Sequence, residues 1–184
     1  MSSKLKNPDS LLFWIDLEMT GLDPQKDMIL EIASLMTTKD LEVVAEGPDL
    51  VIHHGLSTLE GMDEWNTEHH QASGLWKSVL ESTVSLAEAE KQTLDFAKIH
   101  CKPSESPICG NTVWQDRRFM YRYMPELEAH FHYRVIDTST IKELYQRWKP
   151  EARLFEKKEA HRALGDIRES IEELKFFKQQ GFIG

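Results

Sequence analysis

Asp16 and Glu18 are the first residues in the sequence whose types and spacing suggest chemistry. They follow the apolar run Leu11–Ile15, at the end of a segment with the composition of a buried strand. Since residues i and i+2 of a strand point to the same face, the two carboxylates would lie together and lose hydration. A divalent cation compensates such a pair most directly, and oxygen ligands suit Mg²⁺ or Mn²⁺. Three other pairs with this spacing are explained by chance on a solvated surface: Asp40/Glu42, Glu88/Glu90 and Glu126/Glu128.

Three further residues could complete a metal site. Asp116 lies early in a helix expected after Gly110, and His161 and Asp166 flank the start of the last expected helix. Five residues on an α-helix turn through about 140°, so we expect Asp166 on the helix and His161 at or before its first turn. Taken singly, Asp166 could be an acid that favours a helix N-terminus, and His161 could be an ordinary exposed histidine.

Together, the four carboxylates and the histidine match the needs of two-metal phosphodiester hydrolysis. One metal generates hydroxide from water and the other stabilises charge on the leaving oxygen, and ions about 3.5–4 Å apart require several carboxylates. Histidine titrates near neutral pH, so His161 could accept the proton of the attacking water. The sequence therefore predicts that these residues meet where the ends of their elements come together.

The secondary structure expected around these residues gives a mixed α/β sheet. Short connections favour an antiparallel meander of the first three strands, and helices alternate with the later strands. The expected strands cover 11–19, 28–37, 42–53, 107–110 and 133–136. The expected helices cover 73–80, 85–100 with Ser85 as N-cap, 113–123, 138–148 and 160–179. This order matches the ribonuclease-H-like fold, which does not by itself determine the chemistry.

Length and composition limit the classes of protein to which this chain could belong. The 184 residues fit one domain, 1–184, in which we expect residues 1–10 to form a flexible N-terminal segment. Thirty-one acidic and 22 basic residues give a net charge of −9, which argues against a clamp on duplex DNA. The apolar runs are too short for a membrane span or a secretory signal. Cys101 and Cys109 provide no disulfide framework, so we expect a cytoplasmic protein.

The metal-site residues lie in stretches that resemble a known family. Asp16-x-Glu18, Asp116 and His161-x4-Asp166 are similar to the three motifs of the DEDDh 3′→5′ exonucleases. The longer stretches, which cover about residues 11 to 180, resemble the oligoribonuclease family within that superfamily. They are WIDLEMTGLDP, MDEWNTEHHQASGL, SPICGNTVWQDRRF, YMPELEAHFHYRVIDTSTIKEL and HRALGDIRES. These stretches are far more specific than the five acid and base positions, which identify only the superfamily.

The resemblance implies a homodimer that hydrolyses very short single-stranded RNAs, chiefly dinucleotides, to 5′-mononucleotides. It implies two divalent ions, Mg²⁺ or Mn²⁺, bound by Asp16, Glu18, Asp116 and Asp166, with His161 as general base. The substrate contacts that it implies are Leu22 as a wedge between the bases, Trp65 and His70 along the substrate, Tyr133 and Arg134 from the partner subunit, and Ser139 and Thr112 near the 5′ phosphate. Trp and Tyr do offer stacking faces and Arg a phosphate fork, although ordinary packing would otherwise explain Trp65 and Tyr133.

Two positions depart from the family pattern. Gly165 stands where the family often has a second Asp, and it weakens the first turns of the last helix by about 1 kcal/mol relative to Ala. Asp166 keeps the required spacing and remains the expected ligand. Thr112 replaces a Ser, which keeps the hydroxyl and adds a methyl group, so neither change removes catalytic chemistry.

Other functions remain open. A DNA-proofreading or RNA-trimming exonuclease would use the same chemistry on a longer strand, and the acidic charge speaks against its open groove. A catalytically inactive nucleic-acid-binding module on the same fold would be expected to lack a carboxylate, and none is missing. A third alternative is a transition-metal site formed by three histidine pairs: His53/His54, His69/His70 and His130/His132. The absence of a cysteine among these pairs makes such a site less favoured.

Overall fold

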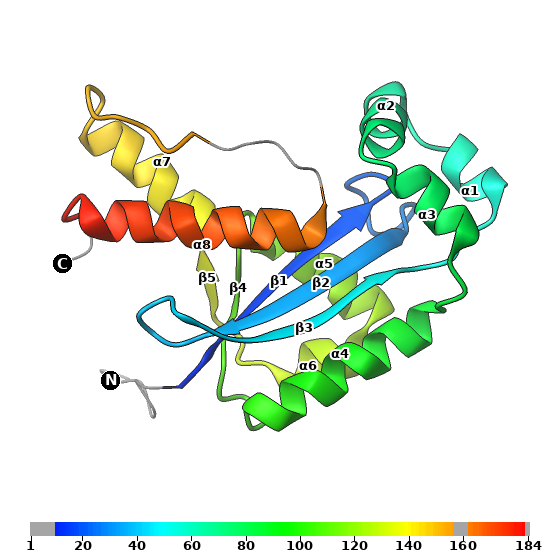
Figure 1. The fold of residues 1–184 in the computed structure, drawn as a ribbon, viewed down its shortest axis with the longest axis horizontal. Helices are drawn as coiled ribbons and strands as arrows, with labels where there is room; N and C mark the ends of the chain where they lie inside the picture. The colour runs from blue at the N-terminus through cyan, green and yellow to red at the C-terminus, as the bar shows by residue number, and fades with distance from the viewer. Residues whose placement is uncertain (1–9, 157–161, 183–184) are drawn as a thin grey trace.

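The computed structural model describes residues 10–156 and 162–182, and Figure 1 shows the arrangement of their helices and strands. The expectations for residues 1–9 and for His161 fall outside this part of the chain. The described strands are β1 (Leu12–Met19), β2 (Ile29–Thr37), β3 (Val43–Val51), β4 (Ile108–Gly110) and β5 (Val135–Asp137). The described helices are α1 (Leu56–Glu60), α2 (Glu64–Ala72), α3 (Leu75–Glu81), α4 (Leu86–His100), α5 (Val113–Tyr123), α6 (Pro125–His130), α7 (Thr138–Trp148) and α8 (Ala163–Gln179).

The strands form one mixed sheet in the order β3-β2-β1-β4-β5. β1 pairs antiparallel with β2, and β2 pairs antiparallel with β3. β4 runs parallel to β1, and β5 runs parallel to β4. The predicted antiparallel meander followed by parallel strands is therefore confirmed, and β1 lies at the centre of the sheet.

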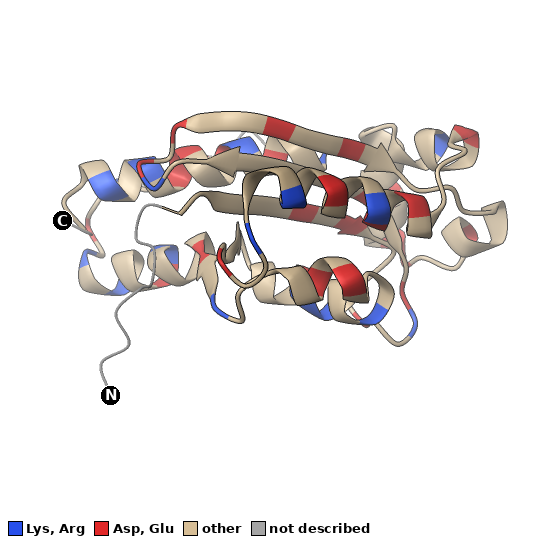
Figure 2. Ribbon diagram, turned by 90° about the horizontal axis from the view of Figure 1, so that it is seen from below, with Lys and Arg blue, Asp and Glu red and all other residues tan. Residues whose placement is uncertain are grey.

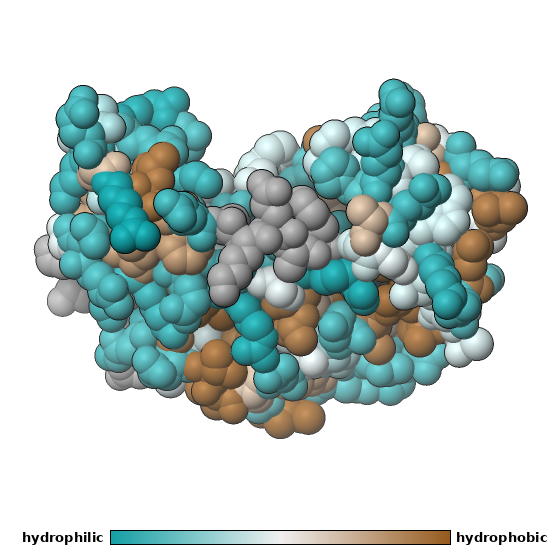
Figure 3. All heavy atoms as spheres, turned by 45° about the horizontal axis from the view of Figure 1, so that its top comes forward, coloured by the Kyte–Doolittle hydropathy of each residue, from teal (hydrophilic) through white to brown (hydrophobic). Residues whose placement is uncertain are grey.

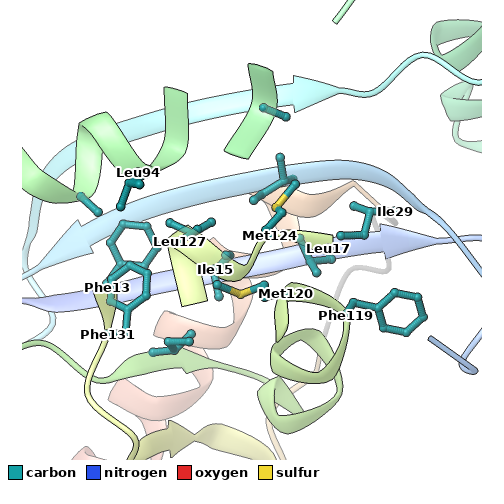
Figure 4. Packing of buried hydrophobic residues seen from close by; sticks show 14 of the residues in the cluster. Phe13, Ile15, Leu17, Ile29, Leu94, Phe119, Met120, Met124, Leu127 and Phe131 are labelled. Atoms are coloured by element: carbon teal, nitrogen blue, oxygen red, sulfur yellow. The ribbon is translucent and has the colours of Figure 1, made fainter. Parts of the chain in front are cut away.

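Alternation along β1 divides its side chains between two helical layers. The odd-numbered residues 13–17 pack against α4, α5 and α6, where Phe13 and Phe131 bring their ring centroids to 4.4 Å (Figure 4). Trp14, on the opposite face, packs against Ala163 and Ile167 of α8. Figure 1 shows α7 and α8 on one side of the sheet and α4 and α6 on the other. Even-numbered residues of β1 therefore face the layer that contains α8.

Three helices were not predicted, and each lacks a strong periodic signal. α1 is only five residues long, and α2 has few apolar residues, so neither shows the apolar stripe of a surface helix. The N-cap Asp63, whose side chain accepts a hydrogen bond from the Asn66 N–H, and Pro125 at the start of α6 are the local signals that mark two of them. Ser85 caps α4 as predicted, accepting from the Glu88 N–H at 3.2 Å.

Charges are mixed over the described surface. Figure 2 shows basic residues interleaved with acidic ones along the helices that cover the lower face of the sheet. Helix pairs such as Lys91–Asp95 and Lys77–Glu81 place opposite charges one turn apart. No helix within the described ranges is long and apolar enough to cross a membrane.

Candidate active site

Three of the predicted acidic residues meet at the carboxyl end of the central strand. Asp16 and Glu18 lie on β1, opposite Ala33 and Glu31 of β2, and Asp166 lies in the first turn of α8. Ligand oxygens of Asp16, Glu18 and Asp166 all lie within 4.8 Å of one another. Strand alternation directs the first two carboxylates toward α8, and the helix supplies the third. Such a set of carboxylate oxygens suits a hard divalent cation.

An ion pair fixes the start of α8 next to this cluster. Glu31 is fully buried on β2 and accepts hydrogen bonds from Arg162 Nε at 2.9 and 3.1 Å. Its Oε2 also accepts from the Ala163 N–H at 3.1 Å, which satisfies an otherwise unpaired amide at the helix N-terminus. Arg162 and Glu31 thereby hold the turn that presents Asp166, so strand β2 contributes to the placement of a residue on α8.

Asp116 reaches the same end of the sheet from the opposite layer. It lies in the first turn of α5, is 6% exposed, and its Oδ1 accepts from the Leu17 N–H at 3.0 Å. It is not one of the three residues within 4.8 Å, because α5 packs on the other face of β1. Its hydrogen bond to the backbone between Asp16 and Glu18 nevertheless fixes it beside them.

Burial and mutual repulsion make these carboxyl groups hold protons more tightly. Burial raises the pKa of Glu18 from 4.5 to about 8, helped by the negative charges of Asp166 and Glu31 and opposed by Arg162. Burial raises the pKa of Asp116 from 3.8 to about 7, although its hydrogen bond from Leu17 lowers it. A cation bound here would offset both the burial and the repulsion, and its binding would be coupled to proton release.

Glu18→Gln is expected to stabilise the metal-free protein at pH 8 by on the order of 1–3 kcal/mol. Between pH 4.5 and about 8 the folded protein retains a proton on Glu18 that the unfolded chain has released. The free energy of unfolding therefore falls as pH rises through this window, and Gln, which does not ionise, avoids the loss. Thermal melting in EDTA from pH 5 to 9 measures the difference, with Glu42→Gln as the exposed control. A Glu18→Gln protein without a growing advantage at high pH would contradict this account.

A pocket of about 180 Å³ adjoins the carboxylates. It is lined by Glu18, by Leu22 from the turn after β1, and by Trp65 and His70 from α2. Leu22 and Trp65 are 71% and 60% exposed, so both present apolar surface to solvent there. His70 is buried and its Nε2 contacts the Met19 carbonyl oxygen at 2.9 Å. The structure thus brings three of the predicted substrate residues together beside the cluster.

Two further predicted residues, Thr112 and Ser139, converge on one carboxylate. Asp137 Oδ1, at the end of β5, accepts from the Thr112 N–H at 2.9 Å. The same oxygen accepts from the Ser139 N–H at 2.9 Å and from Ser139 Oγ at 2.6 Å. The negative charge of Asp137 also raises the pKa of Asp116. Thr112 and Ser139 therefore lie close together, linked to the carboxylate site through Asp137.

Tyr133 and Arg134 lie away from the pocket in this chain. Tyr133 is 73% exposed and lines a shallow hollow of about 630 Å³ with Trp114, Arg118 and Tyr121 of α5. The Arg134 guanidinium lies 5.6 Å from the centre of the Tyr133 ring. Neither residue lines the pocket of Leu22 and Trp65.

Sequence reasoning missed several residues that build the site. Glu31, Arg162 and Asp137 position predicted residues through contacts that only the fold creates. His69 also lines the pocket, and its ring stacks on Trp65 with centroids 3.8 Å apart. The spacing of Trp65 and His69, four residues on a helix, is a signal that could have identified this pair.

The exonuclease family model matches residues 13–174 of this chain. Exonuclease I structures from Methylocaldum szegediense and, with zinc and single-stranded DNA, from E. coli share the fold, with TM-scores of 0.67 and 0.68 at 18% and 16% identity. The similar region covers 93% and 94% of this chain but only 41% of each exonuclease I chain. The family match and the clustered carboxylates together define an exonuclease, an enzyme of the phosphodiester hydrolase class.

Relatives with higher sequence identity show which family of exonucleases the chain belongs to. The oligoribonuclease of Ruthia magnifica subsp. Calyptogena magnifica is 56% identical over 173 residues, which are 94% of this chain and 96% of that protein. The oligoribonuclease of Pseudomonas aeruginosa is 55% identical over 175 residues, 95% of this chain and 97% of its own length. The chain belongs to the oligoribonuclease family of the DEDDh exonucleases.

Proposed function

We propose that this chain is a 3′→5′ exoribonuclease that hydrolyses very short oligoribonucleotides, chiefly dinucleotides, to 5′-mononucleotides. The observation that carries the proposal is the cluster of Asp16, Glu18 and Asp166 within 4.8 Å, directly beside the pocket of Leu22 and Trp65. The reacting phosphodiester lies at the cluster, and the bases lie in the pocket. Figure 3 views the molecule with the top of Figure 1 turned forward and shows mainly hydrophilic side chains on this face, with apolar ones scattered among them.

Asp16, Glu18, Asp116 and Asp166 hold two divalent ions, Mg²⁺ or Mn²⁺, in this proposal. When bound, the ions activate the attacking water and stabilise charge on the leaving oxygen. The raised pKa values of Glu18 and Asp116 support the assignment, because a bound cation would favour the ionised form of carboxyl groups that burial keeps partly protonated near neutral pH. His161 accepts the proton of the attacking water as general base.

The remaining predicted residues bind the two ends of a dinucleotide. Leu22 inserts between the two bases, and Trp65 and His70 lie along the substrate. Thr112 and Ser139 contribute hydroxyl groups near the 5′ phosphate, and their shared link to Asp137 supports a common role. An RNA whose two ends are both held by the protein cannot extend beyond them. These contacts therefore favour a substrate of two nucleotides over a longer strand.

A homodimer completes the site in this proposal, with Tyr133 and Arg134 acting on the partner's substrate. Both are exposed and lie outside the pocket of their own chain, which supports a role across a subunit interface. The adjacent α5 face exposes Trp114 and Tyr121, and aromatic residues together with arginines are enriched in protein interfaces. The two free, buried cysteines suit the predicted cytoplasmic location.

The test is hydrolysis of labelled 2-mer, 5-mer and 20-mer RNA with Mg²⁺, with each product followed over time. We expect 5′-phosphorylated dinucleotides to bind more tightly than 5-mers, because Arg134 of the partner subunit would cap the 5′ phosphate with a bidentate contact. Arg134→Ala is expected to remove most of this difference. The control is Arg153→Ala, which removes an exposed arginine outside the site. Equal affinity for 2-mers and 20-mers would favour an open-groove exonuclease.

Mixing an Arg134→Ala chain with an Asp16→Asn chain tests the shared site directly. In a heterodimer of an Arg134→Ala chain and an Asp16→Asn chain, one site keeps both its own carboxylates and the partner's arginine. We expect partial recovery of activity after subunit exchange. Absence of recovery in chains that are shown to exchange would count against the capped, shared pocket.

A further inference from the structure

The turn that carries Leu22 is fixed by its backbone rather than by packing of its side chain. Leu22 is 71% exposed, so few side-chain contacts hold it in place. On either side of it, Asp27 accepts from the Asp23 N–H at 2.8 Å and from Thr20 Oγ at 3.0 Å. A Cβ atom on Gly21 would lie 2.5 Å from the Asp27 carboxylate, so glycine permits the close approach.

The carbonyl group of Leu22 itself is held by Gln115 of α5. Gln115 is 6% exposed, and its Nε2 donates to the Leu22 carbonyl oxygen at 2.6 Å. Its Oε1 accepts from Arg118 Nη1 at 2.7 Å. Since a carbonyl only accepts and a guanidinium only donates, these two partners fix the orientation of the amide. The Arg118 guanidinium in turn lies 5.8 Å from the centre of the Trp114 ring.

Gln115 and Asp116 are neighbours on α5, and they hold the two ends of the same segment. Asp116 accepts from the Leu17 N–H between the two β1 carboxylates, while Gln115 donates to the Leu22 carbonyl oxygen five residues later. One turn of a single helix therefore sets the separation between the carboxylate cluster and the exposed side chain of Leu22. That separation determines where a base can stack relative to the reacting phosphodiester.

We propose that Gln115 is a positioning residue, oriented by Arg118, that holds Leu22 at the correct distance from the carboxylates and thereby sets the preference for dinucleotides. The inference rests on the proposed function and adds the residues that determine substrate length. In this role Gln115 contacts neither the substrate nor the carboxylate oxygens that would bind the metal ions. It acts through Leu22. A purely structural role, by contrast, would lower stability and activity toward every substrate alike.

The test compares Gln115→Met with Leu22→Ala and with the double variant. Met keeps the length and volume of Gln but cannot donate to the Leu22 carbonyl oxygen. We expect KM for a 5′-phosphorylated dinucleotide to rise about 3- to 10-fold with kcat within about 2-fold, the effect of losing one buried hydrogen bond. If Gln115 acts through Leu22, the double variant is no worse than Leu22→Ala alone. Additive effects, or an unchanged KM in folded Gln115→Met, would overturn the proposal.

A second pair of variants covers the case in which Gln115→Met does not fold. Arg118 and Arg122 lie on the same helix and line the same hollow, but only Arg118 contacts Gln115. Arg118→Met is expected to raise KM for the dinucleotide by about 2- to 5-fold, whereas Arg122→Met leaves it within 2-fold. Equal increases in KM for Arg118→Met and Arg122→Met would show that both arginines act through the hollow that they line. That result would overturn the link between Arg118 and Leu22. A wild-type protein that does not cleave dinucleotides would instead overturn the proposed function, and this inference with it.

Discussion

Asp16→Asn is expected to lower kcat for dinucleotide hydrolysis by about 10⁴-fold or more while the protein remains folded, a loss comparable to removing one member of a catalytic triad. Asp16 lies on the central strand between the buried residues Ile15 and Leu17, so its carboxylate is held rigidly within the cluster. Asn keeps its shape and removes the charge. In the proposed site Asp16 would contact both ions, so we expect its loss to exceed that of the other three acids.

Single-turnover kinetics at saturating Mg²⁺, together with circular dichroism of the variant, measures this loss. Asp40→Asn is the matched control, since Asp40 is an exposed acid paired with Lys39 and Lys178 far from the cluster. We expect the control to retain its rate within about 2-fold, as most surface substitutions do. Chelator-treated wild type that still cleaved dinucleotides at full rate would show that the carboxylates work without metal and would contradict the assignment.

The layered arrangement of the sheet was predictable because it follows from local patterns. The apolar run before Asp16 identifies a buried strand, and alternation places Asp16 and Glu18 on one face. The regular apolar stripe of α8 identifies the helix that covers that face, with Asp166 in its first turn. Strand and helix boundaries accordingly agree closely with expectation wherever periodicity is strong.

Contacts between distant residues were not predictable from one sequence. Glu31 and Arg162 are separated by 131 positions, and nothing in their local sequence indicates that they pair. Asp137 resembles an ordinary helix N-cap, which it is, and only the parallel pairing of β4 and β5 brings it to Thr112. The hydrogen bond of Gln115 to Leu22 likewise depends on the packing of α5 against β1. Residues that position others can therefore be identified only from the fold, whereas the reactive residues can be identified from the sequence.

His161→Ala is expected to reduce kcat by about 10²–10⁴-fold with little change in metal binding, the usual contribution of a general base. His161 lies outside the described residues, and its assignment rests on the motif that it shares with Asp166. Arg162, the next residue in the chain, is anchored by Glu31, and the helix carrying Asp166 begins one residue later. These contacts fix Arg162, the residue next to His161 in the sequence, beside the carboxylate cluster. The general base would act on a water molecule at that cluster.

The dependence of kcat on pH distinguishes a general base from a histidine that only supports the fold. A base must be neutral to accept a proton, so wild-type kcat should fall with decreasing pH if a histidine is the base. Protonation of Glu18 also weakens metal binding at low pH, so the profile must be recorded at saturating Mg²⁺. His161→Ala should lose the acidic limb, whereas the exposed control His53→Ala should keep both the limb and the rate. A His161→Ala protein with near wild-type kcat would show that another group, or the solvent, accepts the proton.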